Sequence, residues 1–72
     1  MARRDRTPLP VVDELVLQIL RTLADGGTTA EAAAAANVSE ATVWRRLQAV
    51  RQEWGVDHNI QVIVRAVRRG LI

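Results

Sequence analysis

The chain has 72 residues, of which 49% are hydrophobic and 25% are charged, and its formal net charge is +2. A chain of this length forms one small domain, because it buries only about 60% of the surface that it exposes when unfolded. Cysteine is absent and His58 is the single histidine, which excludes disulfides and thiolate metal sites, so we expect no metal and no cofactor. The sequence contains neither a long apolar span nor a signal peptide, and therefore predicts a cytoplasmic protein with no membrane contact.

Charge is distributed unevenly along the chain, and all ten basic residues are arginine. Residues 1–11 contain Arg3, Arg4 and Arg6 with few residues that could be buried, and we interpret them as a flexible basic arm. The arm either touches a phosphate backbone or has no role. Basic residues also predominate over acids in residues 39–72, so we expect any polyanion to contact that half of the chain.

Residues 12–72 show the apolar spacing of helices and no strand-like alternation, so we expect an all-α, compact four-helix domain. The predicted helices cover residues 13–25, 30–36, 40–54 and 58–69. The expected N-caps are Asp13, Thr28 or Thr29, Ser39, and Asp57 or His58. The glycine pair at 26–27 and Gly55 are expected to end the first and third helices, because glycine adopts the left-handed conformation at no steric cost.

The joint between the second and third predicted helices is short, since Asn37, Val38 and Ser39 alone separate them. So short a joint forces two helices to cross steeply, as in a helix-turn-helix. The third helix then has a buried stripe, which consists of Val43, Leu47, Val50 and Trp54. Arg45 and Gln48 lie opposite this stripe, where they could pair with guanine and adenine in a major groove, or could form an ordinary solvated face.

The fourth predicted helix is apolar on two sides. One side carries Ile60, Ile63, Val64, Val67 and Leu71, and the other carries Val62 and Ala66. This is more apolar surface than so small a chain can cover, so either a second subunit covers one side or the exposed residues have no role.

Enzymatic chemistry is poorly supported, and we expect the chain not to be an enzyme. Catalysis by a nucleophile and a base requires both groups in one pocket, whereas Ser39 and His58 are both placed at helix starts. A phosphate-binding loop would also need a lysine, which the "DGGTT" segment at residues 25–29 does not supply.

Residues 12–72 resemble the LuxR-type (GerE-like) helix-turn-helix domain over its whole length. The resemblance is carried by Ala24-Asp25-Gly26 at the end of the first helix, by Ser39, Thr42 and Val43 in the "S-x-x-T-V" pattern, and by Trp54-Gly55-Val56. It implies a transcriptional regulator whose third helix enters the major groove of duplex DNA and whose fourth helix pairs two subunits. Such a homodimer would be associated with the bacterial nucleoid, either as a free-standing regulator, which the Met1 start favours, or as the effector piece of a larger one.

The resemblance also implies roles for individual residues. The implied base contacts are Trp44, Arg45 and Gln48. The implied phosphate contacts are Thr42, Arg46, Arg51 and the Thr28/Thr29 start of the second helix. The implied dimer face consists of Val62, Ala66 and Arg69.

Several positions depart from the family pattern. Ala32 and Ala36 replace larger apolar residues, and we expect Trp54 to fill the space that they leave. Trp44 stands where relatives carry a cation, and it could contact a thymine methyl, dock the arm, bind a partner or pack over Arg51. An alternative function is therefore a protein-interaction module that binds another regulator or RNA polymerase through Trp44 and the Val62/Ala66 face.

Overall fold

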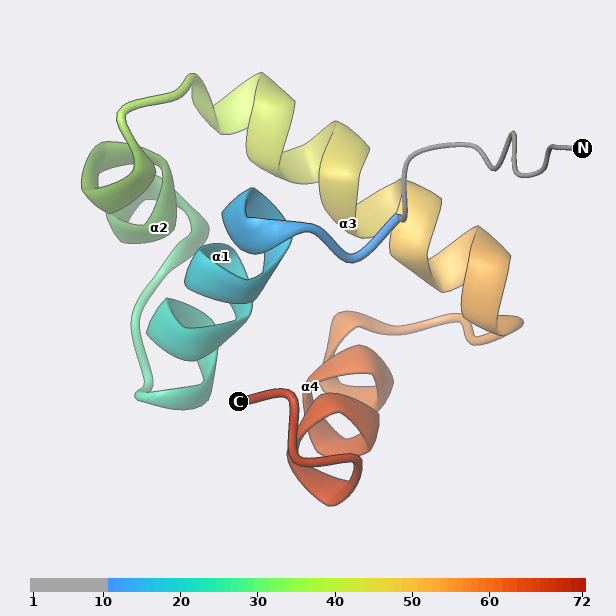
Figure 1. Cartoon of the computed structure of the whole chain (residues 1–72). Coiled ribbons are helices and arrows are strands. Elements are labelled where there is room, and N and C mark those ends of the chain that lie inside the picture. Colours follow the sequence, from blue (N-terminus) through green and yellow to red (C-terminus); the bar gives the residue numbers. More distant parts are fainter. Residues whose placement is uncertain (1–10) are drawn as a thin grey trace, which may run out of the picture.

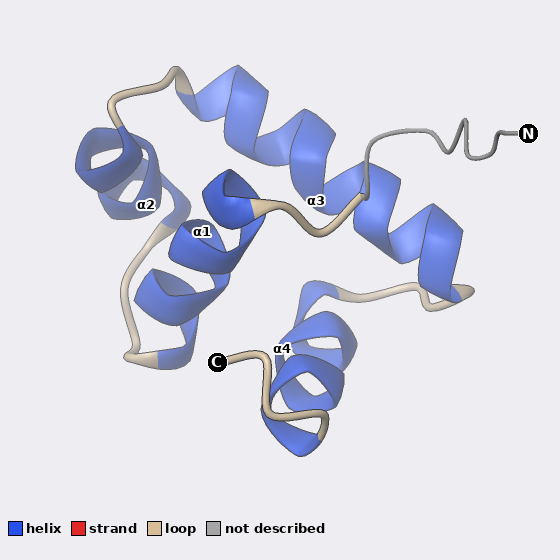
Figure 2. Ribbon diagram, in the orientation of Figure 1, coloured by secondary structure: helices blue, strands red, loops and turns tan. Residues whose placement is uncertain are grey.

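The computed structural model describes residues 11–72, which form four helices and no strand (Figures 1 and 2). The helices are α1 (Glu14–Ala24), α2 (Thr29–Ala36), α3 (Glu40–Trp54) and α4 (Asn59–Arg68). This architecture confirms the predicted all-α, four-helix fold, and each predicted helix end lies within one residue of the observed end. The predicted arm lies outside the described residues except for Val11. None of the helices in the described part combines the length and the apolar character that a membrane span requires.

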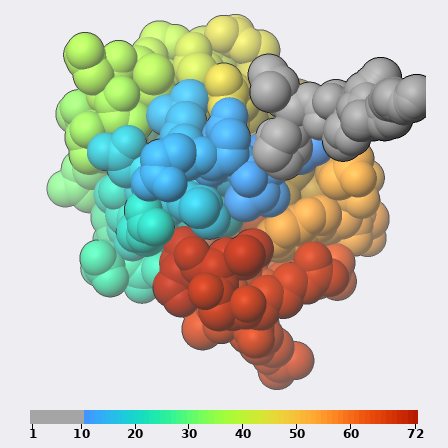
Figure 3. Space-filling model, in the orientation of Figure 1, coloured from blue at the N-terminus to red at the C-terminus, as the bar shows by residue number. Residues whose placement is uncertain are grey.

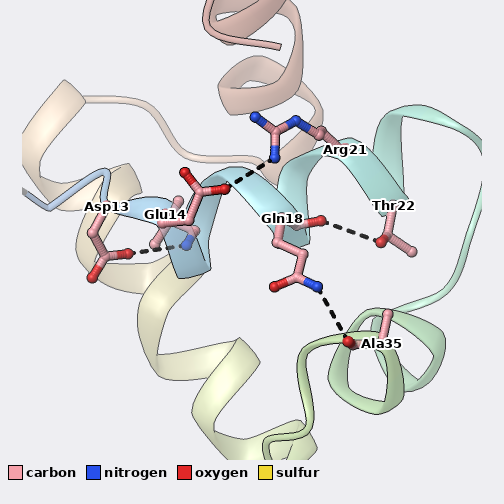
Figure 4. Close-up of polar contacts among 7 residues, drawn as sticks. Asp13, Glu14, Gln18, Arg21, Thr22 and Ala35 are labelled. Carbon is pink, nitrogen blue, oxygen red and sulfur yellow. Dashed lines mark hydrogen bonds and ion pairs between the residues drawn. The ribbon is translucent and has the colours of Figure 1, made fainter.

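Hydrogen bonds of its side chains begin α1 and anchor it to α2 (Figure 4). The Asp13 carboxylate accepts from the Val16 amide at 3.0 Å and caps the helix, as predicted. The Gln18 side chain donates to the Ala35 carbonyl of α2 at 3.2 Å, which ties the two helices together. Gly26 then adopts a φ of +90° and ends the helix, because a residue with a Cβ is strained in this conformation.

The turn between α2 and α3 follows the predicted pattern. Asn37 adopts a left-handed conformation with φ of 59°, which asparagine tolerates better than most residues. Ser39 caps α3 by accepting from the Thr42 amide at 3.1 Å. In Figure 1, α2 is seen nearly end-on, whereas α3 runs across the view. The two helices therefore cross steeply at this short turn.

All four helices contribute to a single apolar core. Its fully or almost fully buried members are Val16, Ile19, Leu20, Ala32, Ala33, Val43, Leu47, Val50, Val62 and Ala66. No described polar or charged residue is buried with them. The small alanines of α2 let that helix pack closely on its neighbours, since they hold no side chain beyond the Cβ.

Trp54 does not fill space beside α2, and this prediction was wrong. Trp54 ends α3, whereas α2 lies beside the start of α3 (Figure 1). The indole is half-buried and packs against α4, where the guanidinium groups of Arg65 and Arg69 lie 5.9 and 5.1 Å from its ring centre. The Arg65 guanidinium also donates to the Trp54 carbonyl at 3.0 Å.

The orientation of α4 corrects the assignment of Val62 and Ala66 to a dimer face. Both residues have 0% exposed surface and belong to the core of one chain. The bonds of Arg65 to Trp54 and of Asn59 to Arg51 hold the Val62/Ala66 side of α4 against α3. The opposite side of α4 is exposed and carries Ile60, Val64 and Val67, and Leu71 is exposed three residues beyond the end of the helix; we call these four residues the α4 stripe. Since α4 has two apolar sides, helical periodicity alone could not decide which of them is buried.

Candidate nucleic-acid interface

The outward face of α3 is open along its length. Val43, Leu47 and Val50 are fully buried, which confirms this part of the predicted stripe. The exposed residues of the opposite face are Ala41, Trp44, Arg45, Gln48 and Gln52. In the space-filling view, the start of α3 (yellow-green) lies along an outer edge of the molecule, whereas its end (orange) adjoins α4 (Figure 3). An amphipathic helix placed in this way can approach a large partner without displacing any other element.

The three predicted base-contacting residues share this open face. Arg45 and Gln48 are exposed, and Trp44 retains 51% of its surface. Both cation–π pairs within residues 11–72 involve Trp54, so the structure shows no cation–π pair for the alternative in which Trp44 packs over Arg51. The structure thus brings together a guanidinium, an amide and an indole, which are groups that can contact base edges and thymine methyls.

Two of the predicted phosphate contacts are already engaged within the chain. The Arg46 guanidinium lies 2.8 Å from the second carboxylate oxygen of Asp13, and Arg51 donates to the side-chain oxygen of Asn59. These contacts hold Arg46 against the start of α1 and Arg51 against the start of α4. Each guanidinium retains further donors, but neither is a free cation on the outward face.

Asp13 is suited to serve both as a cap and as an ion-pair partner. The hydrogen bond from the Val16 amide is the largest cause that lowers the pKa of this carboxyl below its usual value. Partial burial opposes this effect, and the nearby Arg46 guanidinium reinforces it. Asp13 is therefore ionised at neutral pH, where its charge is paired with that of Arg46.

The hydroxyl groups predicted to meet phosphates lie at helix starts, as expected, but acidic residues accompany them. Thr28 and Glu31 form a reciprocal cap, in which the Glu31 amide donates to the Thr28 hydroxyl at 3.0 Å. The Thr29 hydroxyl donates to the Glu40 carboxylate at 2.9 Å. A phosphate arriving at this edge would meet the negative charge of Glu40.

Glu40 is a residue of this edge that was not among the predicted contacts, which were arginines, hydroxyl residues, Trp44 and Gln48. A signal was nevertheless present in the sequence. An acid in the first turn of a helix is favoured by the helix dipole and lies near the cap residue, here Ser39. Its contact with Thr29 joins the start of α2 to the start of α3.

Two helices that cross steeply at a short turn, with the outward face of the second helix open, define a helix-turn-helix domain. A family model of the bacterial regulatory helix-turn-helix proteins, lysR family, matches residues 16–70, and the chain belongs to this family. Comparisons with curated proteins and with solved structures found no match. The match confirms the helix-turn-helix class, whereas the LuxR-type relationship is not what the family model shows and stays a prediction.

Proposed function

We propose that the chain is a sequence-specific transcriptional regulator that binds duplex DNA and inserts α3 into the major groove. The observation that carries the proposal is the open face of α3, on which Arg45 and Gln48 stand without a facing acid, in a member of a regulatory helix-turn-helix family. A major groove admits one α-helix, and these two side chains complement guanine and adenine. The proposal includes no catalytic role.

Charge on the described residues supports this orientation. Arg45 lies near the middle of the open face, whereas Glu40 and Glu53 lie near the two ends of α3. The predicted basic arm, residues 1–11, would add cations to the domain formed by residues 12–72. A regulator of this kind would act at the nucleoid in the cytoplasm.

Two steps test the proposal. Bound sequences are first selected from a random duplex pool, and a selected and a scrambled duplex are then titrated at low and high salt. We expect the selected duplex to bind more tightly, and added salt to weaken binding to both duplexes because phosphate contacts release counterions. Tryptophan fluorescence supplies the readout, since Trp44 is 51% exposed on the open face. Trp44→Phe should remove that part of the signal, because Trp54 lies against α4.

The competing function is a protein-interaction module whose DNA binding is lost or secondary. It is favoured by the exposure of Trp44, because tryptophan is enriched among residues that dominate protein interfaces. Wild-type protein that binds no duplex at low salt would overturn the DNA-binding proposal and favour a partner such as another regulator or RNA polymerase.

We also propose that two copies pair through the α4 stripe, in place of the buried Val62/Ala66 face. The stripe is exposed by 62% at Ile60, 43% at Val64, 53% at Val67 and 37% at Leu71. Its helical members, Ile60, Val64 and Val67, lie opposite the side of α4 that the core covers, so one chain alone leaves this apolar surface in contact with water. Arg69, the third residue of the predicted dimer face, packs on Trp54 instead. Two-fold pairing of this kind would match a pseudo-palindromic DNA site.

Val64→Asp is expected to convert such a dimer to monomers, because it places two carboxylates in the apolar interface. Sedimentation of the protein without DNA measures the mass. Ala30→Asp is the matched control, since Ala30 is exposed on α2 and the same charge there should leave the dimer intact. A dimer that persists with Val64→Asp, or a wild-type protein that stays monomeric at high concentration, would contradict pairing through the α4 stripe.

A further inference from the structure

Three side chains at the start of α3 are joined by hydrogen bonds. The hydroxyl groups of Ser39 and Thr42 lie 3.0 Å apart, and the Arg45 guanidinium donates to the Thr42 hydroxyl oxygen at 3.3 Å. The residues are three positions apart, a spacing that brings side chains together along a helix surface. The row runs from the cap of α3, where Ser39 also accepts from the Thr42 amide, to the exposed arginine of the open face.

We propose that Thr42 is a positioning residue for Arg45 and thereby sets the base preference of α3, rather than serving mainly as a phosphate contact. The inference rests on the proposed function, because it deepens the role of Arg45 within it. A guanidinium can only donate hydrogen bonds, whereas a hydroxyl can also accept them, so the contact from Arg45 to Thr42 has a single direction. Either hydroxyl of the Ser39–Thr42 pair can supply the proton between them, and the Thr42 oxygen remains an acceptor in both cases.

The Thr42 side chain that accepts from Arg45 has restricted rotation. Threonine is branched at Cβ, which restricts its χ1 rotation, and Ser39 fixes the Thr42 hydroxyl from the other side. A contact between one edge of the guanidinium and Thr42 leaves the other donors free to face a base. An arginine ordered in this way loses less conformational freedom on binding than a freely rotating one, which favours the base that fits its geometry.

Arg45 differs in this respect from the other two arginines of α3. Arg46 is held by Asp13 and Arg51 is held by Asn59, and both contacts direct the guanidinium toward neighbouring helices. Thr42, by contrast, belongs to α3 itself and contacts Arg45 from within the helix. Of these three arginines, Arg45 is therefore the one whose position is set by α3 alone and whose side chain is fully on the exposed side.

The test compares Thr42→Val, which removes the hydroxyl but keeps the branched shape, with Thr42→Ser, which keeps the hydroxyl. Arg45→Ala first identifies the base pair at which the wild-type preference is lost. Binding of each Thr42 variant is then measured to a selected duplex and to duplexes changed at that base pair. We expect Thr42→Val to reduce discrimination at that base pair by roughly fivefold, the effect of one ordinary hydrogen bond. Thr42→Ser should retain the wild-type discrimination, and the salt dependence of binding should be unchanged in both variants.

A double variant separates positioning from direct contact. In the Arg45→Ala background, Thr42→Val should have no further effect on discrimination, because Thr42 acts through Arg45. A uniform loss of affinity for all duplexes in Thr42→Val, additive with Arg45→Ala, would overturn the inference and assign Thr42 to a phosphate. Discrimination at wild-type level in Thr42→Val would also overturn it, whereas failure of the wild-type protein to prefer any duplex would overturn the proposed function itself. Circular dichroism confirms that each variant is folded.

Discussion

Val62→Asp is expected to unfold the domain, whereas Val64→Asp, two residues further along α4, should leave it folded. Val62 has 0% exposed surface and Val64 has 43%. An ionised carboxylate at position 62 would have no described polar partner in the core, and burial of such a charge costs many kcal/mol or forces the group to remain protonated. The whole stability of a chain of this length is only roughly 4–11 kcal/mol, so the buried substitution removes most of it.

Urea unfolding followed by circular dichroism measures this difference. The two variants introduce the same side chain into the same helix, so helix propensity and net charge change equally and only burial differs. The proteins are compared at one concentration, well below that at which the wild type would form dimers. Under these conditions the urea midpoint of Val64→Asp should lie near that of the wild type. If Val62→Asp unfolded like wild type while Val64→Asp did not, α4 would be turned by half a rotation from the orientation described, and the Val62/Ala66 side would again be the exposed one.

Arg45→Ala is expected to remove about 1–3 kcal/mol of discrimination at one base pair, because a bidentate contact between arginine and guanine is worth this amount. Arg45 is exposed on the open face, and its guanidinium has donors beyond the one that Thr42 accepts. Binding to scrambled duplexes should fall much less, since one base contact contributes little to the interaction with the phosphate backbone.

Competition between the selected duplex and its single-base variants measures the discrimination. Arg21→Ala is the matched control, because Arg21 is an exposed arginine of α1 that pairs with Glu14 and lies beside Val67 of α4. It removes the same formal charge and should leave base preference unchanged. Equal discrimination by wild type and Arg45→Ala would contradict the assignment of Arg45 as a base-reading residue.

The sequence by itself determined the helices and the turn between α2 and α3. These features depend on interactions between neighbouring residues, namely the caps at Asp13, Thr28 and Ser39 and the left-handed conformations of Asn37 and Gly55. The open face of α3 was also predictable, because this helix has a single apolar stripe and only one way to bury it. The helix-turn-helix class followed from these elements, whereas the family did not, since related families share the same joint.

Tertiary structure decided which side of α4 is buried and which arginines are engaged. A helix with two apolar sides satisfies its periodicity in either orientation, and the packing of α4 on α1 and α3, together with the contacts of Asn59 and Arg65 with α3, selects one of them. Arg46 pairs with Asp13 across 33 positions of sequence, a distance over which residue spacing carries no information. The physical reason is the same in both cases: local sequence sets the conformation of each segment, whereas the partners of a side chain depend on how the segments pack together.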